Sequence, residues 1–102
     1  MSSEILSGLH NQLLRGRILK LCFLAHQTGL GADVLEKILL QEGFNIGKND
    51  VINAFNYLKG KGLIHVEPCE NKILGLKREI ASILPKGIDV LEGTEPAEGI
   101  EL

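Results

Sequence analysis

The chain has 102 residues, of which 44% are hydrophobic and 24% charged, and its formal net charge is −2. This length suits one domain and is too short for two, and the low aromatic content of 4% predicts an aliphatic core. The longest apolar run, Leu21–Ala25, is far shorter than the roughly 20 residues of a membrane span. With no signal-peptide pattern at the N-terminus, we expect a cytoplasmic protein without membrane contact.

The charge is unevenly distributed along the chain. Residues 1–84 hold ten Lys or Arg and eight Asp or Glu, a net charge of +2, whereas residues 85–102 hold one Lys and five acidic residues, a net charge of −4. The acidity therefore belongs mainly to the C-terminal end, and the body of the domain is mildly basic.

A long amphipathic helix is predicted for residues 3–26, because leucines recur there at intervals of three and four. Gly8 and Gly16 each weaken a helix by about 1 kcal/mol relative to Ala, which leaves open a break that would make residues 1–16 a separate N-terminal arm. We interpret the cluster of Arg15, Arg17 and Lys20 as solvated charges in preference to phosphate contacts.

Two further helices are predicted to begin in the same way. After a turn at residues 27–31, Leu30 and Leu35 have the spacing of a hydrophobic staple around an N-cap at Gly31. The pattern recurs with Ile46, an N-cap at Gly47, and Asp50 and Val51 in the first turn. Only residues 43–47 connect the two helices, and so short a connection favours the steep crossing of a helix-turn-helix.

The third helix should bury one side and expose the other. Val51, Phe55 and Leu58 share the predicted core face. The opposite face carries Asn49, Asn53 and Asn56, with Lys48 and Lys59 on its flank. Glycines at 60 and 62 then end the helix, the second being suited to a left-handed cap.

A β-hairpin is predicted to follow from Leu63, with a return strand over residues 80–84. Pro68 either ends the pairing or restricts it to an edge strand, and residues 70–72 form a polar turn. Three apolar residues lie at or near the hairpin tip, where they either fold back on the strands or contact a partner; they are Ile73, Leu74 and Leu76.

The order of elements predicts a mainly α fold with a small β-hairpin (α+β), a winged helix-turn-helix with a three-helix core and a wing. Pro85 can begin a short C-terminal helix that ends near Gly93. We expect a single domain over residues 1–93 and a loosely held acidic tail over residues 94–102, whose end Ile100 and Leu102 could anchor.

No pattern in the sequence indicates an enzyme, a cofactor or a metal site. There is no nucleophile elbow and no glycine-rich phosphate loop. We predict that Cys22 and Cys69 are free thiols, because reducing compartments disfavour structural disulfides. Cys22 and His26 lack the further ligands that zinc needs, so we expect a half-buried thiol beside an interfacial imidazole. His10 and His65 likewise have no evident partners.

Residues 51–67, VINAFNYLKGKGLIHVE, resemble the last helix and first wing strand of winged helix-turn-helix proteins. Residues 83–93, ILPKGIDVLEG, resemble the segment after the wing in bacterial and phage regulators, and residues 84–102 are similar to small phage-associated members. The resemblance implies a third helix in the DNA major groove and a wing on the backbone. By position, it implies base contacts from Lys48, Asn49, Ile52, Asn53, Asn56 and Lys59, and phosphate contacts from Lys72, Lys77 and Arg78.

We therefore predict a transcriptional regulator that binds double-stranded DNA, with asparagine amides able to make bidentate contacts to adenine. Because few basic residues are available, we expect a homodimer that multiplies the phosphate contacts, with the N-terminal arm as the dimer element. The alternative is a protein-protein interaction module without direct DNA binding, which would use Ile73, Leu74 and Leu76 or the C-terminal tail.

Overall fold

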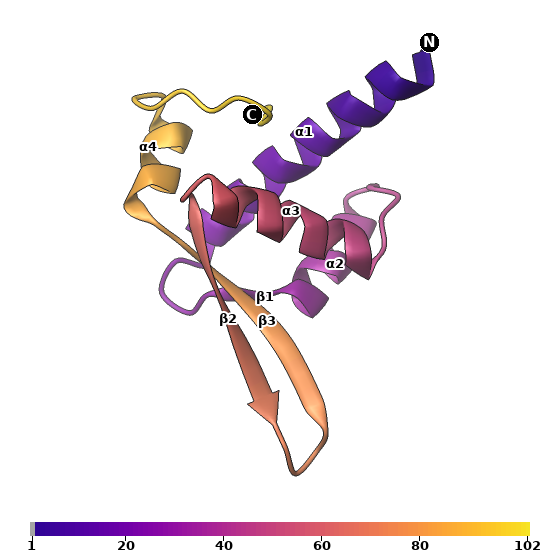
Figure 1. Cartoon of the computed structure of the whole chain (residues 1–102), viewed down its shortest axis with the longest axis vertical. Coiled ribbons are helices and arrows are strands. Elements are labelled where there is room, and N and C mark those ends of the chain that lie inside the picture. The colour runs from indigo at the N-terminus through magenta and orange to yellow at the C-terminus, as the bar shows by residue number, and fades with distance from the viewer. Residues whose placement is uncertain (1) are drawn as a thin grey trace.

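The computed structural model describes residues 2–102, without the side chains of residues 2–6, 71 and 76. Its elements are α1 (Ser2–Leu24), β1 (Leu30–Gly31), α2 (Ala32–Gln41), α3 (Lys48–Gly60), β2 (Ile64–Asn71), β3 (Leu76–Ile83) and α4 (Pro85–Glu92) (Figure 1). The three long helices pack above a β-hairpin that extends away from them. This arrangement is the predicted winged helix-turn-helix, an α+β fold.

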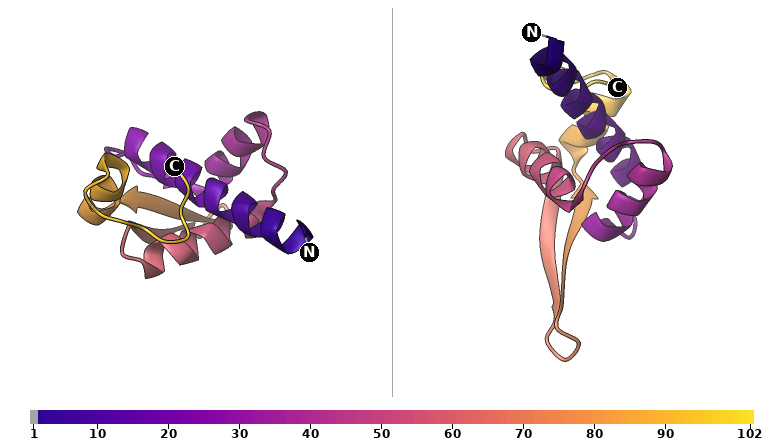
Figure 2. Two further views of the ribbon diagram at one scale, coloured as in Figure 1. Left: turned by 90° about the horizontal axis from the view of Figure 1, so that it is seen from above. Right: turned by 90° about the vertical axis from the view of Figure 1, so that its right-hand side faces the viewer.

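Helix α1 continues through Gly8 and Gly16 without a break, so residues before Gly16 do not form a separate arm. Its N-terminal end nevertheless projects beyond the rest of the molecule (Figures 1 and 2). On this part of the helix, Leu9 and Leu13 are 47% and 48% exposed. None of the described helices is long and apolar enough to span a membrane.

The predicted N-caps of α2 and α3 and the left-handed glycine after α3 are confirmed, whereas α1 ends at Leu24, two residues earlier than predicted. Helices α2 and α3 begin at extended N-caps, Gly31 and Gly47, and the Gly47 amide donates a hydrogen bond of 2.8 Å to the Asp50 carboxylate. Because glycine has no side chain to accept a hydrogen bond at the N-cap, the side-chain hydrogen bond at this helix end comes from Asp50 in the first turn. Gly62 adopts a φ of +75°, the left-handed conformation expected after α3.

The sheet has three strands in the order β1-β3-β2, all antiparallel. Strand β1 was not predicted, because two residues are too few to show an alternating pattern. The return strand begins at Leu76, earlier than expected, since the run of charged residues at 77–79 conceals its start. Pairing continues past Pro68, and β2 lies at the edge of the sheet, as one of the two alternatives for this proline predicted.

The core lies where α1, α2 and α3 meet the base of the hairpin. Val51, Phe55 and Leu58 are all at most 2% exposed, as predicted for α3. Leucine and isoleucine from the other elements complete the cluster, including Ile18, Leu19, Leu35, Leu39, Leu63 and Ile64. No described polar or charged side chain is buried. The wing and the outer face of α3 therefore stand on a rigid aliphatic base.

Residues 94–102, which we call the C-terminal strap, run back from α4 across α1 and α3 (Figure 2). The Tyr57 hydroxyl donates to the Glu98 carbonyl at 3.0 Å, and the Glu101 amide donates to the Gln12 carbonyl at 3.0 Å. The expectation of a loosely held tail is wrong. Besides these hydrogen bonds, the partly buried side chains of Ala97 and Ile100 pack against the core, so the anchor suggested at Ile100 is confirmed.

Candidate nucleic-acid interface

One side of α3 faces the wing across an open groove. Lys48, Ile52, Asn56 and Lys59 follow one another at intervals of four, four and three residues, so they form a stripe along the helix. Two hollows, of about 450 and 340 Å³, lie between this stripe and the strands. They share Ile52, Lys77 and Glu79, and we call the continuous channel the wing groove; its remaining lining residues are Ala32, Asp33, Phe55, Val66, Pro68 and Arg78.

The three asparagines of α3 are exposed, as predicted, but they do not share one environment. Asn56 lines the wing groove, whereas Asn53 lines a separate hollow of about 370 Å³ between α3 and α1, together with Asp50 and Arg15. Asn49 lies on the outer surface between the two. The asparagine face therefore spans the width of the helix rather than lining one channel.

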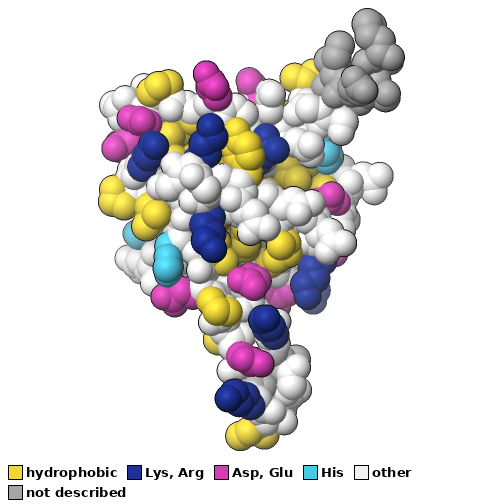
Figure 3. Space-filling view, viewed as in Figure 1, with side chains coloured by type: hydrophobic (Ala, Val, Ile, Leu, Met, Phe, Trp, Pro, Cys, Tyr) yellow, Lys and Arg dark blue, Asp and Glu magenta, His cyan; other side chains and the backbone are white. Residues whose placement is uncertain are grey.

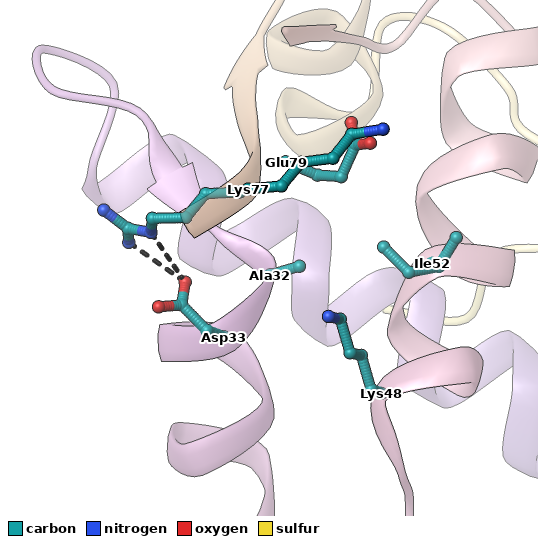
Figure 4. Close-up of a pocket in the computed structure, with 7 residues that line it drawn as sticks. Ala32, Asp33, Lys48, Ile52, Lys77 and Glu79 are labelled. Atoms are coloured by element: carbon teal, nitrogen blue, oxygen red, sulfur yellow. Dashed lines mark hydrogen bonds and ion pairs between the residues drawn. The ribbon is translucent and has the colours of Figure 1, made fainter. Parts of the chain in front are cut away.

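Lys77 and Arg78, both predicted to neutralise phosphates, leave the wing on opposite faces because strand side chains alternate. Arg78 turns towards α2, where its guanidinium donates two hydrogen bonds of 3.2 and 3.0 Å to one carboxylate oxygen of Asp33 (Figure 4). The hydrogen bond from Arg78 holds the pKa of Asp33 below its ordinary value. In this structure Arg78 is engaged within the protein, and Lys77 and Lys48 are the lysines of the first and larger hollow.

Acidic residues accompany these cations. The first hollow combines Lys48, Lys77 and Arg78 with Asp33 and Glu79. Acidic and basic side chains alternate along the wing in Figure 3, and Lys72 lies exposed close to its tip. Sequence reasoning missed Asp33 and Glu79, because their proximity to the lysines depends on strand register and on the β1 to α2 junction. The result is a groove of mixed charge.

At the hairpin tip, Ile73 is 94% exposed and Leu74 is 67% exposed. Neither side chain is buried against the strands, so the fold-back alternative does not hold for Ile73 and Leu74. The side chain of Leu76, the third residue of this predicted contact patch, lies outside the described part of the structure.

The remaining titratable side chains do not assemble into a site. No group of three or more metal-ligating residues occurs among the described residues. Cys22 is fully buried rather than half-buried, and burial raises the pKa of its thiol to about 12, whereas Cys69 is exposed. His65 lies 3.0 Å from Glu67, and His10 packs near the ring of Phe44.

No family model and no curated protein matches the sequence. Among solved structures, the chain is similar to the crystal structure of a PadR-like transcriptional regulator from Bacillus cereus. The TM-score is 0.60 and the sequence identity 24%, over 79% of this chain and 76% of that one. This likeness supports the winged-helix fold.

Proposed function

We propose that the protein is a DNA-binding transcriptional regulator that inserts α3 into the major groove and sets its wing on the DNA backbone. The observation that carries the proposal is the exposed polar face of α3 beside the wing groove. A helix that is polar on its outer side and supported by a rigid core has the geometry for reading base edges. The fold neighbour, described as a transcriptional regulator, agrees with this proposal.

Within this proposal, some residues contact the DNA bases and others contact its phosphates. Asn49, Asn53 and Asn56 are all exposed, so their amides can pair with adenine, and Ile52 in the wing groove offers an apolar contact to a thymine methyl group. The phosphate contacts come from Lys48 and Lys59 at the edge of α3 and from Lys72 and Lys77 on the wing.

We further propose that the functional form is a homodimer. The mixed charge of the wing groove limits the affinity of one copy, and two copies on a symmetric site would double the phosphate contacts. The projecting end of α1, with half-exposed Leu9 and Leu13, is the proposed contact surface. Light scattering at high protein concentration tests this: a dimer mass is expected, and a monomer mass contradicts it.

Fluorescence anisotropy with mixed-sequence duplex DNA at several salt concentrations tests DNA binding. Affinity should fall as salt rises, and the Asn53→Glu and Lys72→Glu changes together should abolish it. Lys37→Glu is the matched control, because Lys37 is exposed on α2 and does not line the wing groove. Absence of binding by the wild-type protein at low salt would reject the proposal.

A second candidate function is a protein-protein interaction module without DNA binding. The observation that favours it is the pair of exposed apolar residues at the wing tip, Ile73 and Leu74. This candidate predicts no DNA binding at low salt, so the same titration distinguishes the two functions.

A further inference from the structure

The C-terminal strap occupies basic side chains that would otherwise be available on α1. The Arg15 guanidinium donates to the Gly99 carbonyl at 3.1 Å, and the Lys20 ammonium donates to the Leu102 carbonyl at 2.8 Å. Arg15 also stacks on the Tyr57 ring, with 3.7 Å between the guanidinium carbon and the ring centroid. Arg15 therefore has a neutral peptide carbonyl as its hydrogen-bond partner, and Lys20 contacts the backbone of the last residue of the strap.

Two glycines permit the close approach of this strap. Gly16 lies in the middle of α1, where alanine would favour the helix, yet a Cβ at this position would overlap the Glu101 carbonyl. On the strap side, Gly99 has a φ of +79°, and a Cβ there would overlap the Tyr57 hydroxyl. A Cβ at Gly8, in the same helix as Gly16, would meet no atom of another segment within 4 Å. The close approach at Gly16 is therefore caused by the strap and is not a general feature of α1.

The charges along this contact are complementary. The strap contains three acidic residues and no basic one; they are Glu95, Glu98 and Glu101. Beneath or beside it lie basic side chains from α1, the α3 exit and α4. Arg15 and Lys20 bind its carbonyls, and Lys61 and Lys86 line a hollow of about 280 Å³ together with Glu98. We call these four cations the second basic edge.

The second basic edge and the wing groove lie on opposite flanks of α3. Ile52 faces the wing groove, whereas Tyr57, about 140° further round the helix at 100° per residue, contacts the strap. A helix in the major groove, which is about 12 Å wide, has a phosphate backbone on each side. The wing groove is placed to contact one of these two phosphate backbones, and the flank of α3 beneath the strap is placed to contact the other.

We propose that the second basic edge binds the DNA phosphate strand opposite the wing, and that residues 94–102 are a cover that must leave before it does so. This inference rests on the proposed DNA-binding function. While docked, the strap holds Arg15 and Lys20 and places the acidic residue Glu98 beside the end of α3, where its negative charge repels phosphate. Its release both frees the two cations and removes the repulsion.

Gly16→Ala tests the proposal, because its methyl group displaces the strap at Glu101. Gly99→Ala displaces the strap from the other side and leaves α1 unchanged, and Gly8→Ala is the matched control in α1. Tyr57 is the only tyrosine and the chain has no tryptophan, so acrylamide quenching of its fluorescence reports release directly. Affinity for duplex DNA is then measured by anisotropy across salt concentrations.

Both strap variants should show greater quenching of Tyr57, several-fold tighter DNA binding at low salt, and a slope of log affinity against log salt steeper by roughly 1.8 per bound copy, for two added phosphate contacts on each copy. Gly8→Ala should behave like the wild-type protein. Increased quenching with an unchanged affinity and slope would overturn this proposal alone. Unchanged quenching in both strap variants would also overturn it, whereas no DNA binding by any variant at low salt would reject the proposed function as well.

Discussion

The ion pair between Asp33 and Arg78 should restrain DNA binding, and Asp33→Asn should strengthen it. In the wild-type protein both guanidinium hydrogen bonds of Arg78 go to one oxygen of Asp33. Asparagine keeps the size of the side chain but removes the charge that holds Arg78. The freed guanidinium can then turn to a phosphate at the rim of the wing groove.

The magnitude follows from one additional phosphate contact. Each contact on duplex DNA contributes about 0.9 to the slope of log affinity against log salt. Lowering the salt from 200 to 50 mM should therefore increase the affinity of Asp33→Asn more than that of the wild-type protein, by a factor of roughly 3.5 for each bound copy. Because both side chains are exposed, with 42% and 55% of their surfaces accessible, the change should cost less than about 1 kcal/mol of stability.

The pH dependence of this small contribution has a definite sign. Arg78 lowers the pKa of Asp33 in the folded state, so the pair stabilises the protein above the ordinary carboxyl pKa of 3.8 and ceases to do so as pH falls through the lowered value. Asp33→Asn should therefore be slightly less stable than the wild-type protein at pH 7 and no less stable in strong acid.

The second exposed ion pair provides the control. Arg17 donates to Glu42 at 2.8 Å, in a position outside the wing groove, so Glu42→Gln removes a comparable interaction without freeing a cation there. This control should leave the salt slope unchanged. Anisotropy titrations at four or more salt concentrations measure both variants. A slope for Asp33→Asn equal to that of the wild-type protein would refute the reasoning.

Three further predictions concern the scaffold. Leu58→Ala removes a fully buried side chain and should lower the free energy of unfolding by about 2–5 kcal/mol in urea denaturation. Gly62→Ala should lower the free energy of unfolding by about 1–2 kcal/mol because φ is +75° at this residue. Gly60→Ala, at the end of α3 with open space around it, should leave stability unchanged or increase it. Equal effects of the two substitutions in thermal melts would count against a special backbone conformation at Gly62. At pH 8 iodoacetamide should label Cys69 and spare Cys22, since burial raises the pKa of the Cys22 thiol to about 12. Mass spectrometry showing early labelling of Cys22 would contradict its burial. Because the Cys22 thiol ionises more readily in the unfolded chain, unfolding should also become easier as pH rises above about 9.

Local signals in the sequence were sufficient for the helices and for the side of α3 that is buried. Val51, Phe55 and Leu58 follow the helical period, and Gly62 adopts a conformation that few other residues reach readily. Because these signals come from neighbours in the chain, they could be read without knowing how distant segments meet.

The features that were missed depend on distant segments. Leu30–Gly31 becomes a strand only because Ala81 and Ile80 pair with it. Arg78 looked like a free cation until Asp33, 45 residues away, was placed beside it. The hydrogen bonds of the strap go largely to its backbone, which no side-chain pattern reveals. Two traces of it were present in the sequence: Ile100, which packs against the core, and a glycine at 16 inside a predicted helix, which could equally have marked a break.

The most direct test of the proposed DNA-binding surface is two-dimensional NMR of the ¹⁵N-labelled protein titrated with duplex DNA at low salt. Binding as proposed predicts shifts in the amide signals of α3 from Lys48 to Lys59 and of the wing around Lys72 and Lys77, with little change in α2 beyond its first turn. Shifts confined to the wing tip, or a spectrum unchanged at saturating DNA, would contradict the proposal.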